Sequence, residues 1–212
     1  MGVENLDYSS LNTEVSKAIS KISTQKSDQQ LIIFRITINV SEVALYIDPY
    51  TPPWKQYTPI KACIYPEARI PFRHKTTNAL VSVAARKKVT EMGFNEAILV
   101  DESQFVREGA WSNLFWVDKK NKVHTPKSGM LPGITRQAVM ECVDVIEDNI
   151  RYSELISTAK EIFITQATTG VTPVSQINEV AVGDGRVGDI TLGVMEVFEK
   201  LAAKNTTQII LQ

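Results

Sequence analysis

The chain has 212 residues and a formal net charge of −1, with 43% hydrophobic and 22% charged residues. This is the composition of a soluble globular protein that can bury a sizeable core. The Lys and Arg residues are scattered, which argues against a nucleic-acid partner, because such a partner needs a basic surplus on one face. No apolar run approaches the roughly 20 residues of a membrane span. Residues 1–10 also lack the basic and apolar regions of a signal peptide.

The cysteines and histidines are few and far apart. Cys63 and Cys142 form no CxxC-type motif, so we expect free thiols in a reducing cytoplasm rather than a disulfide. His74 and His124 are the only histidines, and there is no cysteine cluster. We therefore expect a cytoplasmic protein without a metal site.

The first part of the chain is expected to contain one helix and three strands. Apolar residues recur at helical spacing over 11–22, with Ser and Lys between them. A turn-rich segment at 48–53 and a segment without periodicity at 66–75 are expected to be connections. Runs of β-branched residues predict strands over 31–40, 43–48 and 60–65.

The second part mixes helices with short strands. Thr76 or Thr77 is the predicted cap of a helix that runs to about Met92, and Gly93 closes it. Gly133 is expected to open a helix through about Ile146, and a last helix to cover 190–203. The predicted strands are 96–101, 105–107, 113–117, 122–125, 161–165 and 174–177. This mixture predicts an α+β (mixed α/β) fold, with a boundary near residues 70–78.

Three short segments have the composition of ligand-binding loops. Gly133 begins a helix within LPGITR, and the free N–H groups and positive dipole end of a helix start can bind phosphate or carboxylate. Thr168 and Thr169 follow a predicted strand; hydroxyl groups there can hold phosphate oxygens, although an ordinary turn is the commoner explanation. Glu108 follows another strand, where a carboxylate is usually solvated. None of the three identifies a function by itself.

The order of these segments resembles the successive motifs of the class IV aminotransferases, the fold type IV enzymes that use pyridoxal 5'-phosphate. That family includes branched-chain aminotransferases, D-amino-acid aminotransferases and aminodeoxychorismate lyases. The resemblance implies a small N-terminal α/β domain, here 1–75 with its connector, and a larger C-terminal pseudo-barrel domain that binds the cofactor, here 76–212. The matching motifs are HKTTN at 74–78, EGAWSNLF at 108–115, LPGITR at 131–136 and TTGVTPV at 168–174.

The resemblance also implies roles for single residues. Lys75 matches the catalytic lysine that forms a Schiff base with the cofactor and moves the substrate proton. Glu108 matches the carboxylate that keeps the pyridine nitrogen protonated. The remaining cofactor-binding residues are expected to be Leu131 against one ring face, and, at the phosphate, the amides of Ile134 and Thr135, the Thr135 hydroxyl, and Thr169 with Thr168.

Some features depart from the family pattern. Trp111 stands where the family usually has a small or polar residue, so it either narrows the pocket or belongs to the core. Arg136 is expected to pair locally rather than to bind substrate. Family members have further residues before the point that Met1 matches, including an arginine in a His-x-x-Arg-Leu setting that binds the cofactor phosphate. No such motif occurs before Lys75. Either the start of the gene is misplaced, the chain has been cut, or this is a reduced member of the family; if the chain starts at Met1, we expect a weakened phosphate site.

The resemblance leaves the reaction open. EGA at 108–110 and LPGITR resemble transaminases, especially the branched-chain type. Asn78, three residues after Lys75, and NLFW at 113–116 resemble the lyases and D-amino-acid aminotransferases. We predict transfer of an amino group between an amino acid and a 2-oxo acid. The alternatives are an aminodeoxychorismate lyase and a folded member that no longer catalyses. A homodimer whose substrate is a small-molecule amino or keto acid is expected.

Overall fold

The computed structural model describes residues 12–17, 20, 32–38, 43–49, 51, 57–70 and 73–204. Contacts between residues divide the chain into two compact units. Unit 1 consists of Met1–Pro53 and Thr207–Gln212, and unit 2 of Trp54–Thr206. Within the described residues no helix is both long and apolar enough to cross a membrane.

The described part of unit 1 contains a helical segment and a β-hairpin. The predicted helix 11–22 lies partly outside the described residues, and 12–17 are helical. Strand β1 (Ile32–Ile38) pairs antiparallel with β2 (Val43–Pro49), in a register that joins Ile32 to Pro49 and Ile38 to Val43. Both strands were predicted, because each is a run of β-branched residues.

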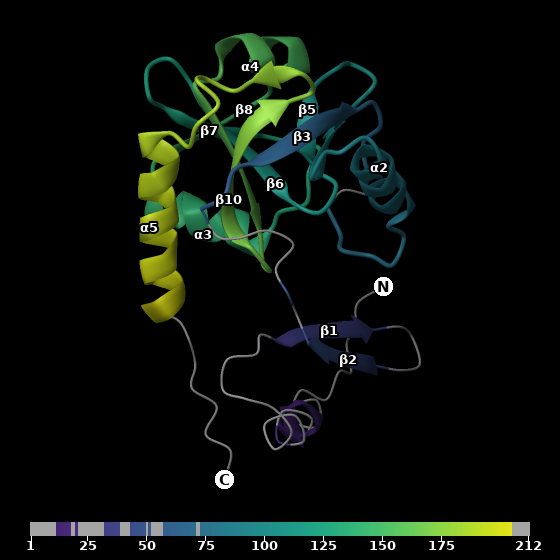
Figure 1. Cartoon of the computed structure of the whole chain (residues 1–212). Coiled ribbons are helices and arrows are strands. Elements are labelled where there is room, and N and C mark those ends of the chain that lie inside the picture. Colours follow the sequence, from purple (N-terminus) through teal and green to yellow (C-terminus); the bar gives the residue numbers. More distant parts are fainter. Residues whose placement is uncertain are drawn as a thin grey trace. The chain divides into compact units, whose positions relative to one another are not determined.

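Unit 2 is built on a mixed sheet of nine strands, which curls in Figure 1. The strand order is β5-β4-β3-β10-β9-β6-β7-β8, and β11 pairs with β10. The pairs β3–β4, β3–β10 and β7–β8 are parallel, and the other ladders are antiparallel. The strands are β3 (Ile60–Tyr65), β4 (Glu96–Val100), β5 (Val106–Gly109), β6 (Asn113–Val117), β7 (Val123–Pro126), β8 (Val145–Asp148), β9 (Glu161–Gln166), β10 (Gly170–Ile177) and β11 (Val180–Ala181).

Helices cover the central strands of this sheet, and β4, β6 and β9 are therefore buried on both faces. Alternate residues of a strand point to opposite faces. In β4, Ile98 and Val100 join the central apolar cluster, whereas Ala97 and Leu99 pack with α2. The helices are α2 (Leu80–Glu91), α3 (Ile134–Cys142), α4 (Tyr152–Thr158) and α5 (Asp189–Lys204). Burial on both faces explains why residues 97–100 of β4 and 114–117 of β6 are continuous apolar runs.

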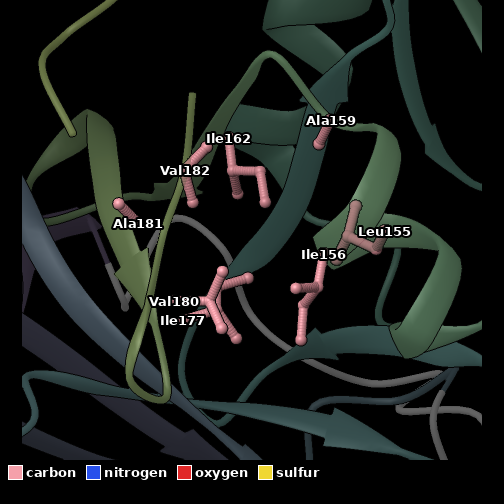
Figure 2. Close-up of a pocket in the computed structure, with 8 residues that line it drawn as sticks. All are labelled: Leu155, Ile156, Ala159, Ile162, Ile177, Val180, Ala181 and Val182. Atoms are coloured by element: carbon pink, nitrogen blue, oxygen red, sulfur yellow. The ribbon is translucent and has the colours of Figure 1, made fainter. Parts of the chain in front are cut away.

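The short helix α4 closes one side of the central cluster. Figure 2 shows Leu155 and Ile156 of α4 opposite Ile177, Val180 and Val182 from the β10–β11 hairpin and the residue after it. All side chains that line this crevice are apolar. It has neither the room nor the polar groups of a ligand site, and it therefore contributes to the core.

The sequence predictions for two helices were wrong at one end. Helix α2 begins at Leu80 after Ala79, not after Thr76 or Thr77, and no side chain caps it. Helix α3 ends at Cys142, because residues 145–148 form β8 and pair with β7. That pairing is non-local, and the apolar residues of 143–146 fit a helical pattern as well as a strand. The seven-residue helix α4 was not predicted.

The domain boundary that the sequence predicts, between 75 and 76, stays a prediction. In the structure β3 lies before this boundary, yet it pairs with β10 on one side and β4 on the other. Residues 60–65 thus belong to the sheet of unit 2 rather than to the hairpin unit. A run of apolar residues in the sequence does not indicate which sheet it joins.

Candidate active site

Unit 2 contains a cavity of about 360 Å³. Its walls come from four segments that are distant in the sequence: the connector and start of α2 (69–82), the β5–β6 turn (108–113), the start of α3 (131–135), and the end of β9 (165–167). Five of the seven sequence-predicted site residues line this cavity, namely Lys75, Glu108, Leu131, Ile134 and Thr135. Thr168 and Thr169 do not line it.

Glu108 is a buried carboxylate in the cavity wall. Only 4% of its surface is exposed, and its two oxygens accept hydrogen bonds from different segments. The Arg69 Nε–H group donates to Oε1 at 3.1 Å, and the backbone N–H of Leu131 donates to Oε2 at 2.9 Å. Burial raises the pKa of Glu108, and the hydrogen bond from Leu131 and the charge of Arg69 offset part of this rise. The sequence reading that this carboxylate is ordinarily solvated does not hold here.

Arg69 joins Glu108 to the segment that carries Lys75. Besides its contact with Glu108, Arg69 donates through Nη1 to the carbonyl oxygen of His74 at 3.3 Å. The Arg69 guanidinium group therefore forms hydrogen bonds with both the buried Glu108 carboxylate and the residue just before Lys75. Sequence reasoning missed this role, because no spacing rule connects Arg69 to Glu108, 39 positions away.

The loop before α3 is held to the sheet through Leu131. The Asn113 side-chain amide donates to the Leu131 carbonyl at 2.7 Å, while the Leu131 N–H binds Glu108. Gly133 lies so close to Asn113 that an added Cβ atom would stand 2.1 Å from its Oδ1. A larger residue at position 133 would therefore force the Asn113 side chain to move, and Asn113 is a further site residue that the sequence reading did not single out.

The N-terminus of α3 opens on the cavity without a side-chain cap. Gly133 is the N-cap residue, and the first turn contains no acidic side chain. The first N–H groups of a helix have no partner within the helix. Together with the positive end of the helix dipole, these groups attract an anion. The Thr135 side chain is buried in the cavity wall, next to these groups. The predicted helix start at Gly133 is confirmed, and its role as a phosphate site stays a prediction.

Arg136 points away from the cavity, as predicted. Its buried guanidinium donates to the Thr125 hydroxyl, to the Pro126 carbonyl at 3.1 Å and to the Glu147 carboxylate at 2.6 Å. These bonds tie α3 to β7 and β8. The positive charge of Arg136 is therefore balanced by Glu147 and by hydrogen bonds within the protein.

The end of β9 supplies Thr165, Gln166 and Ala167 to the wall. The Thr165 hydroxyl is buried and has no hydrogen-bond partner among the described residues. Thr168 and Thr169 form the turn between β9 and β10, and the Thr169 hydroxyl is 3.3 Å from that of Thr172. The predicted turn is present, and a phosphate role for these two threonines stays a prediction.

Lys75 supplies an amine to the cavity. Its side chain is exposed there, and it forms no hydrogen bond or ion pair with the part of the chain that the structure describes. The amine is therefore available for a ligand. The cavity thus combines a free lysine, a buried carboxylate and an uncapped helix start.

Comparison with known families shows which family the chain belongs to. The family profile described as "Amino-transferase class IV" matches residues 2–177. The chain is a class IV aminotransferase family member. The sequence resemblance is confirmed, and the mixed α+β fold is the one that this family's structures have.

Several relatives of this family member are named branched-chain aminotransferases. A protein of Aquifex aeolicus named "Probable branched-chain-amino-acid aminotransferase" is 38% identical over 138 residues, which are 61% of this chain and 44% of that protein. A putative branched-chain amino acid aminotransferase from Thermotoga maritima has a structure with a TM-score of 0.74 at 29% identity, covering 89% of this chain and 71% of that one.

A further structure supports the fold. The branched-chain amino acid aminotransferase from Thermobaculum terrenum, in its PLP-form, has a TM-score of 0.69 at 24% identity, covering 79% of this chain and 60% of that one. The chain spans about half the length of the curated relatives that it matches.

Proposed function

We propose that this protein is a pyridoxal-phosphate-dependent transaminase that moves an amino group between an amino acid and a 2-oxo acid, with Lys75 as the residue that carries the cofactor. The observation that supports this most strongly is the meeting of Lys75, Glu108 and the α3 N-terminus in one cavity. When bound, pyridoxal phosphate supplies an electron sink that acidifies the Cα–H bond of an amino acid. The protein must supply an amine, a partner for the ring nitrogen and a cradle for the phosphate.

The residues present fit these three needs. The Lys75 amine is without a described partner, and it can take up and release a proton next to the substrate. Glu108 provides a buried negative charge for a protonated ring nitrogen, and Arg69 and the Leu131 N–H hold it in place. The carboxylate is thus positioned before any ligand binds, which avoids the cost of reorganisation.

The phosphate fits best at the start of α3. Ile134 and Thr135 offer N–H groups there, and the Thr135 side chain adds a hydroxyl. The hydrogen bond from the Asn113 side chain to the Leu131 carbonyl supports the loop that leads into this helix start. We infer that Thr168 and Thr169 complete the cradle from the β9–β10 turn, which continues directly from Ala167 in the cavity wall.

Transamination is favoured over the lyase reaction by the names of the relatives. The curated proteins that match are branched-chain aminotransferases from bacteria and archaea, among others. We further infer a homodimer, which light scattering of the purified protein can test. The cytoplasm is the proposed location, and the two free cysteines, Cys63 and Cys142, agree with a reducing compartment.

Donor screening by absorbance tests the proposed reaction. The protein loaded with pyridoxal phosphate is mixed with single amino acids, without any acceptor. A transaminase passes the amino group to its cofactor, so we expect the bound cofactor's absorbance to change to that of the amine form. A 2-oxo acid added afterwards should reverse this change. Release of pyruvate and p-aminobenzoate from aminodeoxychorismate, with no spectral change for any amino acid, would instead indicate the lyase.

A further inference from the structure

Trp111 is a large aromatic residue in the cavity wall rather than in the core. Its side chain lines the cavity, and 47% of its surface is exposed. Its neighbours along the chain, Phe115 and Trp116, are almost fully buried. The sequence alone left open whether Trp111 is part of the core or narrows the pocket. Its exposure at the cavity favours the second reading.

The turn that carries this indole is fixed by backbone hydrogen bonds. The Gly109 N–H donates to the Ser112 carbonyl at 2.7 Å, which closes the turn. The Ala110 N–H donates to the Ala97 carbonyl of β4 at 2.8 Å. The residues on both sides of the tryptophan are thus tied to the sheet or to one another. These bonds constrain the backbone position from which the Trp111 side chain reaches the cavity.

A buried ionic contact holds the far end of the same turn. The Ser112 hydroxyl donates to the Glu96 carboxylate at 3.2 Å. Glu96 is fully buried in β4, and Arg86 of α2 lies 3.3 Å from the same carboxylate oxygen. Moving Ser112 would leave a buried carboxylate with one hydrogen bond fewer, which is costly. These contacts therefore constrain the backbone of the turn that carries Trp111.

The cavity leaves little room beside the indole. Its volume of about 360 Å³ is near the lower end of the range of about 300–1,000 Å³ for small-molecule sites. Under the proposed function this space must hold both the cofactor and the side chain of the amino acid. An indole carried on a turn whose backbone is held by hydrogen bonds occupies part of this space and thereby sets a steric limit on that side chain.

We propose that Trp111 is the specificity-determining residue of the cavity, and that it restricts the substrate to amino acids and 2-oxo acids with small side chains. This inference rests on the proposed transaminase function. It concerns the choice of substrate rather than the reaction. A smaller residue at position 111 widens the site and lets bulky side chains enter.

Binding of stable cofactor–substrate conjugates tests this without requiring turnover. The probes are N-(5'-phosphopyridoxyl)-alanine and N-(5'-phosphopyridoxyl)-phenylalanine, which differ only in the side chain. Isothermal titration calorimetry gives Kd for each. We expect the wild type to bind the alanine conjugate more tightly. Trp111→Ala should change the ratio of the two Kd values at least about tenfold in favour of the phenylalanine conjugate, since side-chain misfit in a pocket is worth about 10- to 200-fold.

Two further variants keep the test decisive. Trp111→Phe retains a smaller ring in the wall. It should change the ratio of the two Kd values in the same direction as the alanine variant but by less, and this can be measured even if the alanine variant does not fold. Ile146→Ala is the matched control, because Ile146 is 46% exposed but lies on β8, outside the cavity lining. It should leave both Kd values unchanged.

The outcomes separate this inference from the proposed function. A ratio that changes less than about threefold in Trp111→Ala or remains unchanged in Trp111→Phe contradicts the specificity role. A selective loss of the phenylalanine conjugate also contradicts it, because the indole would then bind the side chain rather than exclude it. If the wild type binds neither conjugate, the proposed cofactor site itself is wrong.

Discussion

At the scale of single residues, Glu108 has the most constrained environment of the proposed cofactor-binding groups. It is buried, it bonds to Arg69 and the Leu131 N–H, and its pKa is raised mainly by burial. A carboxylate whose charge is costly in isolation is stabilised when a positive group arrives beside it. A protonated ring nitrogen is such a group, and under the proposed function Glu108 would stabilise the positive charge of the bound cofactor.

Glu108→Gln should lower the rate of reaction with an amino acid much more than it weakens cofactor binding. Glutamine keeps the shape and a hydrogen bond, but its neutral amide cannot stabilise a positive ring nitrogen. We expect the single-turnover rate to fall at least about tenfold, which is about 1.4 kcal/mol of barrier. Stopped-flow absorbance measures this rate, and equilibrium dialysis measures retention of the cofactor.

The matched control is Glu102→Gln, which changes an exposed carboxylate in the turn before β5. It should leave both quantities unaltered. A rate for Glu108→Gln within about threefold of wild type would remove Glu108 from the proposed mechanism.

The sequence predicted site residues that lie within a family motif. It missed the residues whose hydrogen bonds form only between distant segments of the folded chain. The motif positions Lys75, Glu108 and Thr135 were assigned by resemblance, and the structure brings them into one cavity. Arg69 and Asn113 bind Glu108 and Leu131, and only the folded chain reveals these partners. An isolated Arg or Asn has no local signal for a contact that depends on the packing of distant segments.

At the scale of elements, a buried contact between α2 and β4 supports the β5–β6 turn. Glu96 accepts hydrogen bonds from the Ala97 N–H and the Ser112 hydroxyl, and it pairs with Arg86. Burial raises the pKa of Glu96 above its ordinary value of 4.5, although Arg86 and the hydrogen bonds act in the opposite direction. The folded state therefore holds this proton more tightly than the unfolded state does.

This raised pKa predicts a pH dependence of stability. As the pH rises above about 4.5, the unfolded chain loses the Glu96 proton first, so the free energy of unfolding falls until the raised pKa has been passed. Glu96→Gln cannot ionise and lacks this contribution. The free energy of unfolding of the wild type minus that of the variant should therefore decrease between pH 4.5 and neutral pH. Urea unfolding at several pH values measures this difference, and an increase would show that the pKa of Glu96 is lowered instead.

The element boundaries show where local patterns stop being informative. The start of α2 was predicted too early, because Thr76 and Thr77 have the side chains of a helix cap, yet Ala79 is the N-cap. The connector containing Thr76 and Asn78 instead lines the cavity. The end of α3 was predicted too late, because β8 forms only through its parallel pairing with β7. Both errors come from tertiary contacts that override a local preference.

At the scale of the whole molecule, the sheet order is the feature that the sequence could not predict. The strand β3 lies between β4 and β10, and its partner in β10 is more than 100 positions further along the chain. This arrangement brings the ends of β5 and β9, the start of α3 and the Lys75 segment to one cavity. The mixed fold class was predicted from the order of helices and strands, because that order is a local property.

The central claim is that Lys75 carries pyridoxal phosphate in this cavity, and reductive trapping tests it most directly. The full chain is incubated with pyridoxal phosphate, reduced with borohydride, and examined by intact-mass and peptide mass spectrometry. We expect one equivalent of cofactor on the peptide that contains Lys75, and none on Lys75→Ala. The exposed α2 residue Lys87 serves as the control, and Lys87→Ala should be labelled as fully as the wild type. Equal labelling of Lys75→Ala at another lysine would contradict the account.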